Sequence, residues 1–391
     1  MTAALAGIRI LDLTHFVAGP WATTLLADFG ADVIKVEHPD RGDGSRYLDE
    51  VFGAGMSSYF VGLNRGKRSI ALDLQSPDGI EVVGQLLEGC DVLIANFRPG
   101  VLQRLKLDYE SLAQRHPRLI HVSVTAFGEG GPMAARPAMD IIVQAAGGVM
   151  GLTGPSDGSP VKIGAPMADY LGSYMAFSAI ALALFVRQKF GFGQAIEVNL
   201  LDGQVSMLAN FMAGHARTGK PEGPQGSGHP QIVPYQLFDT VDGSIVIGCL
   251  TNHFWLGLCD ALELPELKAD PRFLTNGARV AHRDVLVPVI AARIAQRTTA
   301  AWIPLLERQG VPCCEVSSLA DVASSEQVRR NGMVRDTVHP RLGPVRVVGN
   351  PLRLKATPPV MGLHAPALGE HTEQILGEIA WQPAARQARH S

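Results

Sequence analysis

The sequence predicts an α/β protein whose first domain holds a mostly parallel sheet covered by helices. Two observations predict this fold class. Short runs rich in β-branched residues alternate with helix-like runs through the first third of the chain. Hydrophobic residues also make up 46% of the 391 residues, which is enough for packed cores. In such a fold we expect ligands at the carboxyl ends of the strands.

The expected elements follow one another closely along the first domain. Strand-like runs occupy residues 8–13, 32–37, 69–74, 91–97 and 119–127, and helix-like runs occupy residues 21–30 and 79–89. A glycine-rich passage then leads to a long apolar helix over about 169–190, which a Gly-Phe-Gly turn ends, and to a further strand after it.

The composition changes over residues 214–235, which are rich in glycine and proline and show no hydrophobic period. Strand and helix patterns resume over residues 236–325, as in a smaller α+β domain. We therefore expect a large domain from residues 1–213 and 330–391 and a small domain from residues 225–325. The linkers between them are residues 214–224 and 326–329.

Charge and cysteine usage exclude several classes of protein. The net charge is −3, so we expect no nucleic-acid partner. The five cysteines have no Cys-x-x-Cys spacing and the histidines have no ligand spacing, so we expect no disulfide framework and no metal site. The first residues lack a basic region, and the longest nearly uncharged run, 171–186, is short for a membrane span. We expect a cytoplasmic protein without a membrane partner.

The opening strand-turn-helix-strand unit has the outline of a dinucleotide site, with Glu37 at the end of its second strand. Its turn carries only Gly19, whereas the dinucleotide fingerprint uses three glycines, so we do not expect NAD or FAD. Basic residues cluster after successive strands, at Arg41 and Arg46, then at residues 65–68, then at Arg98 and Arg104. They are either scattered surface cations or groups that converge on a phosphorylated ligand.

Asp169 is the most informative carboxylate because it opens the long apolar helix. One interpretation is an N-cap, a position at which aspartate is favoured. The other is a nucleophile, because a helix N-terminus keeps a carboxylate ionised and offers backbone N–H groups for an oxyanion. The residue types alone leave both interpretations open.

Several motifs resemble the class III CoA-transferases, the group that contains formyl-CoA and carnitine CoA-transferases. They are the opening LAGIRILDLTHFVAGPWATTLLADFGADVIKVEHPDRGD, the block NRGKRSIALDL, the segment ANFRPGVLQRL, the helix start at Asp169, the GFGQ turn and the late APALGEHT. The resemblance covers nearly the whole chain, and the motifs occur in the family's order.

The resemblance implies a Rossmann-like large domain, a small domain and an interlocked homodimer. It implies that Asp169 attacks an acyl-CoA thioester and forms first an aspartyl anhydride and then an aspartyl-CoA thioester. The substrates would be an acyl-CoA, with succinyl-CoA as a possible donor, and a carboxylic acid acceptor, with no permanently bound cofactor. The implied CoA-binding residues are Val17, Ala18, His38, Leu72, Asn96, Phe97, Arg98 and Arg104, although His38 stands where a relative has arginine.

Two alternatives share the fold. A 2-methylacyl-CoA racemase resembles this chain around Asp140, but racemases have histidine where this chain has Met139, and methionine cannot transfer a proton. The second alternative is a CoA-binding protein without catalysis. Within the transferase interpretation, Arg46, His229, Gln231 and Asn252 are candidates for holding the acceptor carboxylate, and the loop 221–228 is a candidate lid.

Overall fold

The structure is a computed structural model that describes residues 3–53, 55–219, 223–362 and 364–382. Two compact units make up the chain. The first unit consists of Met1–Val149, Ile163–Ala216 and Glu326–Ser391, and the second consists of Met150–Lys162 and Arg217–Ser325. A compact unit is a domain only if it is able to fold alone, and compactness does not show this. The domain boundaries expected from the sequence therefore stay a prediction.

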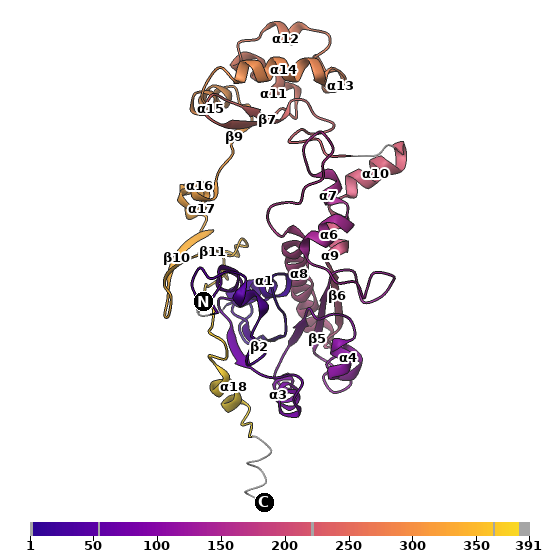
Figure 1. Ribbon diagram of the computed structural model, residues 1–391, viewed down its shortest axis with the longest axis vertical. Coiled ribbons are helices and arrows are strands. Elements are labelled where there is room, and N and C mark those ends of the chain that lie inside the picture. The colour runs from indigo at the N-terminus through magenta and orange to yellow at the C-terminus, as the bar shows by residue number, and fades with distance from the viewer. Residues whose placement is uncertain (1–2, 54, 220–222, 363, 383–391) are drawn as a thin grey trace, which may run out of the picture. The chain divides into compact units, whose positions relative to one another are not determined.

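The first unit contains a six-stranded parallel sheet in the order β3-β2-β1-β4-β5-β6. Its strands are β1 (Arg9–Asp12), β2 (Asp32–Glu37), β3 (Arg68–Ala71), β4 (Val92–Ala95), β5 (Ile120–Thr125) and β6 (Ala195–Asn199). Strands β2, β5 and β6 are labelled in Figure 1. Every neighbouring pair runs parallel, which confirms the expected α/β fold with a parallel sheet. The chain builds outward from β1 to β3 and then crosses back to β4. The carboxyl ends of β1 and β4 therefore flank the crevice where ligands bind in this topology.

Alternate residues of each strand face opposite sides of this sheet, as the period of two requires. Ile10 and Val33 pack on one side with helices α1 (Ala18–Asp28) and α8 (Met167–Phe190). Leu11 and Ile34 pack on the other side with helices α3 (Pro77–Leu87) and α18 (Thr372–Glu378). Both faces are covered, so the strands read as nearly continuous hydrophobic runs.

Shorter helices complete the first unit. They are η1 (Gly44–Tyr47), α2 (Ser58–Leu63), α4 (Val101–Leu105), α5 (Tyr109–Leu112), α6 (Asp140–Ala146), α7 (Val149–Leu152), α9 (Leu200–Ser206), α10 (Ala209–Thr218) and α17 (Glu326–Arg330), of which α7 and α10 run into the second unit at one end. The unit also contains an antiparallel hairpin of β10 (Val334–His339) and β11 (Gly343–Val348).

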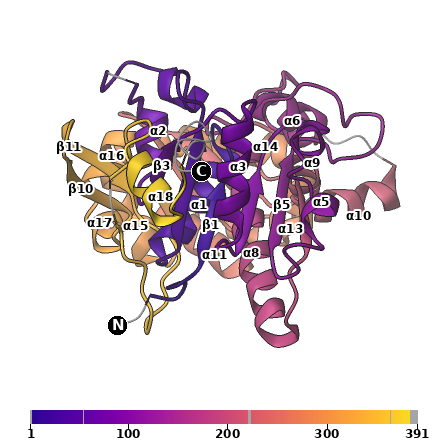
Figure 2. The same ribbon diagram turned by 90° about the horizontal axis from the view of Figure 1, so that it is seen from below.

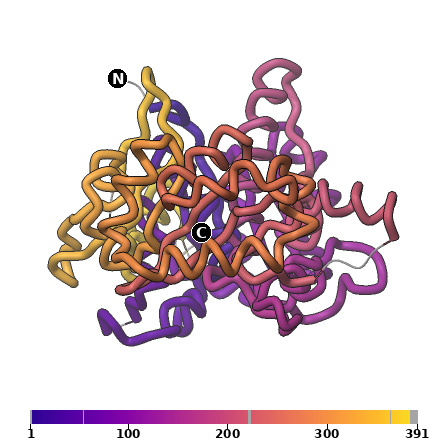
Figure 3. The backbone as a smooth tube through the Cα atoms, turned by 90° about the horizontal axis from the view of Figure 1, so that it is seen from above, coloured from indigo at the N-terminus to yellow at the C-terminus, as the bar shows by residue number. Residues whose placement is uncertain are grey.

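The C-terminal part of the chain returns to the sheet and covers the edge strand β3, beside which Figure 2 shows α18. The backbone nitrogen of Ala71 donates to the Thr372 hydroxyl over 3.0 Å, and the backbone nitrogen of His371 donates to the Ser69 carbonyl oxygen over 2.9 Å. Figure 3 shows the yellow C-terminal segment beside the indigo start of the chain. These bonds satisfy backbone groups that an open sheet edge would leave unpaired.

The second unit combines a three-stranded antiparallel sheet with helices. Its strands are β7 (Tyr235–Asp239), β8 (Ser244–Gly248) and β9 (Cys313–Glu315). Its helices are α11 (Asn252–Ala261), α12 (Glu266–Ala269), α13 (Asn276–Ala281), α14 (Arg283–Ile294), α15 (Thr299–Arg308) and α16 (Leu319–Ser324). Trp255, Phe273 and Trp302 are buried in its core.

Helix α8 is longer than the nearly uncharged run in the sequence suggested. It has 24 residues and a mean hydropathy of 1.5, so by length and composition it is able to cross a membrane, and the expectation that this region is too short was wrong. One such helix is weak evidence of a membrane span, because core helices of proteins outside membranes reach the same length and hydropathy.

Candidate active site

Two hydrogen bonds from one side chain join the ends of β1 and β4 at the crevice. The amide nitrogen of Asn96 donates to the His15 carbonyl oxygen over 2.8 Å, and its amide oxygen accepts from the His15 backbone nitrogen over 2.8 Å. Only a side-chain amide offers a donor and an acceptor in this arrangement. Asn96 therefore fixes the loop that follows β1.

Buried charged side chains also bond to the backbone of this loop. The Lys35 ammonium lies 2.9 Å from an Asp43 carboxylate oxygen and donates to the Thr14 carbonyl oxygen over 2.7 Å. The other oxygen of Asp43 accepts from the backbone nitrogen of Phe16 over 3.1 Å. Burial opposes the charged form of Lys35, but the carboxylates of Asp43 and Asp12 outweigh it and raise the pKa of Lys35.

The loop is held in a strained conformation. Phe16 has a φ of +64°, in the left-handed region that aromatic residues rarely adopt, and its ring is exposed. Such a conformation persists only where the surrounding contacts fix it, and the bonds from Asn96 and Asp43 do so here. This backbone conformation places the Phe16 ring in the crevice.

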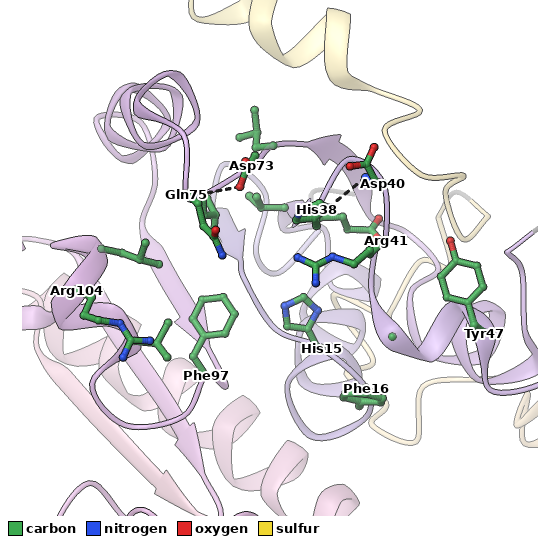
Figure 4. Close-up of a pocket in the computed structure, with 18 residues that line it drawn as sticks. His15, Phe16, His38, Asp40, Arg41, Tyr47, Asp73, Gln75, Phe97 and Arg104 are labelled. Atoms are coloured by element: carbon green, nitrogen blue, oxygen red, sulfur yellow. Dashed lines mark hydrogen bonds between the residues drawn. The ribbon is translucent and has the colours of Figure 1, made fainter.

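A cavity of about 1030 Å³ opens on one side of this loop (Figure 4). It is lined by His15, Phe16, His38, Leu72, Phe97 and Arg104 together with residues 40–42, Gly44 and residues that follow β3. It combines aromatic and aliphatic side chains with the guanidinium groups of Arg41 and Arg104. This composition suits a large ligand with an apolar part and phosphate groups.

A second cavity, of about 530 Å³, opens on the other side of the loop and shares His15, Phe16 and Phe97 with the first. Its further lining includes Val17, Ala18, Asn96, Arg98, Arg136, Asp140 and Asp169. The shared residues make the two cavities neighbours, so one extended ligand is able to contact the lining of both.

Asp140 caps the N-terminus of α8. Its Oδ1 accepts from the backbone nitrogen of Ala168 over 2.8 Å, and its Oδ2 accepts from the Gln144 amide over 2.7 Å. The residue at the N-cap position of α8 is Pro166, whose side chain makes no capping bond. Asp169 is the third residue of the helix, so the N-cap interpretation of Asp169 was wrong.

Asp169 lines the second cavity and is partly buried. Burial and the nearby Asp140 carboxylate raise the pKa of Asp169 to about 7, whereas the sequence suggested that the helix N-terminus keeps it ionised. The shift corresponds to about 4 kcal/mol, which exceeds the 0.3–1 kcal/mol typical of a helix terminus. At neutral pH Asp169 is therefore a basic carboxylate of the kind that catalytic groups require.

Comparison with known proteins decides the family. The sequence profile described as CoA-transferase family III matches residues 5–372. This chain belongs to CoA-transferase family III. It is a CoA-transferase, and enzymes of this kind act on CoA thioesters.

Two curated relatives and one solved structure agree with this assignment. The chain is 41% identical over 375 residues to the succinyl-CoA:glutarate CoA-transferase of Mus musculus, covering 96% of this chain and 86% of that protein. It is 36% identical to the acetyl-CoA:oxalate CoA-transferase of Acetobacter aceti, covering 96% and 95%. The crystal structure of a CAIB/BAIF family protein from Brucella suis has a TM-score of 0.87 at 36% identity, covering 97% of this chain and all of that chain.

The structure of this CoA-transferase gathers the residues predicted to bind CoA around the two neighbouring cavities. His38, Leu72 and Arg104 line the larger one, Val17, Ala18, Asn96 and Arg98 line the smaller one, and Phe97 lines both. Asp169 lies in the smaller cavity. Their roles in binding and catalysis stay predictions.

The basic clusters do not all serve a ligand. Arg65 is buried in an ion pair with Asp28, and Lys67 is buried in an ion pair with Asp12. Arg68 pairs with Asp32 and Glu378. Of the two interpretations left open, convergence on a phosphorylated ligand is wrong for the middle cluster, whose ion pairs join elements of the first unit.

Arg46 is not available to an acceptor carboxylate. It makes hydrogen bonds of 2.7 Å to each carboxylate oxygen of Glu37 and a third bond to the Pro366 carbonyl oxygen, and its guanidinium stacks on Phe60. Arg46 is a buried structural residue, so its proposed contact with the acceptor was wrong.

The other acceptor candidates belong to the second unit. Asn252 accepts a hydrogen bond from Arg279, and the backbone carbonyl of His229 accepts from Arg283. Gln231 donates through its backbone nitrogen to His229. Residues 221–222 of the predicted lid lie outside the described residues, and its remainder, 223–228, is an irregular loop.

The sequence did not identify Asp43 as a residue of the site, named Asp140 only within the racemase alternative, and offered only the backbone N–H groups of residues 16–19 as possible ligand contacts. A carboxylate at the start of one helix that caps another helix gives no local signal, because its partners are 28 residues away. The left-handed conformation of Phe16 gives no signal either, since the residue type does not favour it. For Asp43, its place in the turn after β2 was the only available indication.

Proposed function

We propose that this enzyme transfers CoA from a short acyl-CoA to a carboxylic acid through covalent intermediates on Asp169. The observation that carries the proposal is a partly buried carboxylate of near-neutral pKa in a cavity that adjoins a larger one lined by aromatic and cationic side chains. Placing a CoA thioester with its nucleotide in the larger cavity puts its acyl end in the smaller one.

The reaction consists of four exchanges. An Asp169 oxygen attacks the thioester carbonyl, the C–S bond breaks, and the CoA thiolate leaves an acyl-aspartyl anhydride. The thiolate then attacks the Asp169 carbonyl carbon and releases the donor carboxylate, which leaves an aspartyl-CoA thioester. The acceptor carboxylate attacks that thioester and releases thiolate again, forming a second anhydride. Thiolate finally attacks the acceptor carbonyl, which yields the new acyl-CoA and free Asp169.

This reaction requires the protein to position the reacting groups and to stabilise the oxyanions that form. Every step exchanges one activated acyl group for another, so no outside energy source is required. A raised pKa makes the Asp169 carboxylate a stronger nucleophile, and the carboxylate is still substantially ionised at neutral pH. Neighbouring backbone N–H groups in the first turn of α8 are candidates for the oxyanion hole.

Acidic substrates fit the smaller cavity. Arg98 and Arg136 line it, and within the described residues neither guanidinium forms an ion pair. Free cations beside the acyl site favour acids with a second carboxylate. The mouse relative is named for succinyl-CoA and glutarate, so we propose succinyl-CoA as donor and a short dicarboxylate as acceptor.

Three further proposals concern the whole enzyme. We propose two domains, residues 1–213 with 330–391 and residues 225–325. We also propose that two subunits interlock as a homodimer, and that the enzyme acts in the cytoplasm.

Trapping with hydroxylamine tests the covalent mechanism. The enzyme is incubated with succinyl-CoA and hydroxylamine, and its peptides are mapped by mass spectrometry. Because hydroxylamine attacks anhydrides and thioesters, we expect a hydroxamate at Asp169 and none in Asp169→Ala. Asp78→Asn is the matched control, since Asp78 also lies in the first turn of a helix but is exposed. An unmodified Asp169 during measurable CoA transfer would exclude the covalent mechanism.

A further inference from the structure

Gln144 is a buried amide side chain close to the second cavity that the proposed mechanism does not use. It lies on α6, four residues after Asp140, and its exposed fraction is 0%. A buried side-chain amide is costly unless its polar atoms find partners. The partners of Gln144 therefore indicate what this residue does.

The two partners of Gln144 determine the orientation of its amide group. Its oxygen accepts a hydrogen bond from the backbone nitrogen of Ile163 over 2.9 Å, and its nitrogen donates to Oδ2 of Asp140 over 2.7 Å. A backbone N–H group only donates, so the amide oxygen must face Ile163. The NH₂ group of Gln144 then faces Asp140.

Both carboxyl oxygens of Asp140 consequently face hydrogen-bond donors. The Gln144 amide donates to Oδ2, and the backbone nitrogen of Ala168 donates to Oδ1 over 2.8 Å. Neither donor is able to accept a proton, so both bonds favour the ionised form of Asp140. Protonation of Asp140 would weaken at least one of them.

Asp169 has the opposite environment. Among the described residues no group donates a hydrogen bond to its carboxyl group, and burial together with the charge of Asp140 raises the pKa of Asp169 to about 7. When two neighbouring carboxyl groups hold one proton between them, the proton resides on the group whose ionised form is less stabilised. In this pair that group is Asp169.

We infer that Gln144 is a positioning residue that assigns the proton shared by the two carboxyl groups to Asp169 rather than to Asp140. It acts through Asp140, whose carboxylate it keeps ionised and oriented toward the start of α8. The inference rests on the proposed function, in which Asp169 is the nucleophile.

Other titratable groups lie around the pair. His15, Arg98 and Arg136 also line the second cavity, Tyr170 follows Asp169 on α8, and Asp202 on α9 is exposed and bonded to Asn199. Among the described residues no hydrogen bond joins the side chain of any of them to either carboxyl group. They are the same in every variant below, so a difference between variants reports on Gln144 and Asp140.

The dependence of kcat/KM on pH tests the inference. Gln144→Met keeps the length of the side chain but removes the donor, so Asp140 should take up the proton more readily. We expect the acidic limb to move to lower pH by about one unit, which corresponds to one hydrogen bond to a charged group. Gln85→Met is the matched control, because Gln85 also donates to a carboxylate four residues earlier, that of Glu81 on α3. It should leave the limb in place.

Two further variants separate this role from a packing defect. In the Asp140→Asn background Gln144→Met should not move the limb further, because the charge through which Gln144 acts is already gone. Gln144→Glu keeps the length and an acceptor for Ile163, and its carboxyl group either shares a proton with Asp140 or adds a negative charge. The limb should then stay in place or move to higher pH. The inference is overturned if both substitutions lower the limb equally, or if Gln144→Met lowers it as much without the Asp140 charge.

Infrared titration of the carboxyl groups distinguishes failure of this inference from failure of the proposed function. A protonated carboxyl signal that is absent in Asp169→Asn reports on Asp169 without turnover. Its midpoint should fall in Gln144→Met and not in Gln85→Met. If that midpoint falls while the kinetic limb does not move, Asp169 is not the nucleophile, and the proposed function fails while the role of Gln144 stands. An unchanged midpoint overturns the role of Gln144.

Discussion

At the scale of single residues, burial raises the pKa of Asp169 most, and the Asp140 carboxylate raises it further. Asp140 holds the start of α8 through its hydrogen bond to Ala168, and its charge disfavours ionisation of Asp169. One side chain thus combines a structural and an electrostatic role. The two roles are separable, because asparagine keeps the accepting oxygen and removes the charge.

We therefore predict that Asp140→Asn lowers the pKa of Asp169 below its value of about 7. If the Asp169 carboxylate is the nucleophile, as proposed, the acidic limb of the profile of kcat/KM against pH should move to lower pH, and rates well above pH 7 should change little. Burial still acts on Asp169, so the pKa should stay above its ordinary value.

Steady-state kinetics between pH 5 and pH 9 measure this shift. Asp140→Ala is the comparison variant, since it removes both the charge and the cap and should also destabilise the enzyme by about 1 kcal/mol. An acidic limb that does not move in Asp140→Asn would show that Asp140 does not set the ionisation of Asp169.

At the scale of elements, the loop after β1 joins the two cavities, and Asn96 on the loop after β4 holds it. We predict that Asn96→Ala raises the KM for acyl-CoA about tenfold and lowers the free energy of unfolding by about 1–2 kcal/mol. Both effects have one cause, because the two His15 backbone groups lose their partner and Phe16 is released from its strained conformation.

Thermal unfolding and steady-state kinetics check this prediction together. Asn331→Ala is a control at an asparagine outside the crevice, whose side chain bonds to Gln327. It should leave the KM for acyl-CoA unchanged. A normal KM in Asn96→Ala would mean that the loop keeps its shape without these bonds.

Elements with a strong local pattern were predicted well from the sequence. The strands β1 and β2 and the helix α8 were found within two or three residues, because hydrophobic period and turn residues determine them locally. For the site, the residue types alone named Asp169, Arg98 and Arg104 as candidates, and the family motifs supplied the other residues predicted to bind CoA. The cap at Asp140, the ion pairs of Lys35 and the hairpin β10–β11 depend on contacts between distant or weakly patterned segments, which a single sequence does not reveal.

At the scale of the whole molecule, a buried ionic network joins β1, β2 and the segment before β3. Asp12, Lys35, Asp43 and Lys67 are fully buried, and their ion pairs lie directly beneath the crevice. Such pairs add little net stability while intact, but leaving one charge without its partner is costly in a buried environment. The network therefore couples the folding of the sheet to the shape of the site.

We predict that Lys35→Met lowers the free energy of unfolding by about 3–5 kcal/mol. The variant leaves the Asp43 carboxylate buried without its cation, and the double variant Lys35→Met, Asp43→Asn should recover part of the loss because that charge is gone. Denaturant unfolding at pH 7 measures all three proteins. Equal stability of the single and double variants would contradict an uncompensated charge as the cause.

The same network predicts how acid affects stability. Burial opposes ionisation of Asp43, but Lys35 and neighbouring donors outweigh it and lower the pKa of Asp43 to about 2. A carboxylate with a lowered pKa stabilises the folded state above its unfolded pKa of about 4, and this contribution is lost as pH falls toward 2. Wild-type stability should therefore decline between pH 4 and pH 2. In the double variant the decline should be shallower, because the asparagine that replaces Asp43 does not titrate, and an identical slope in both proteins would exclude Asp43 as a contributor.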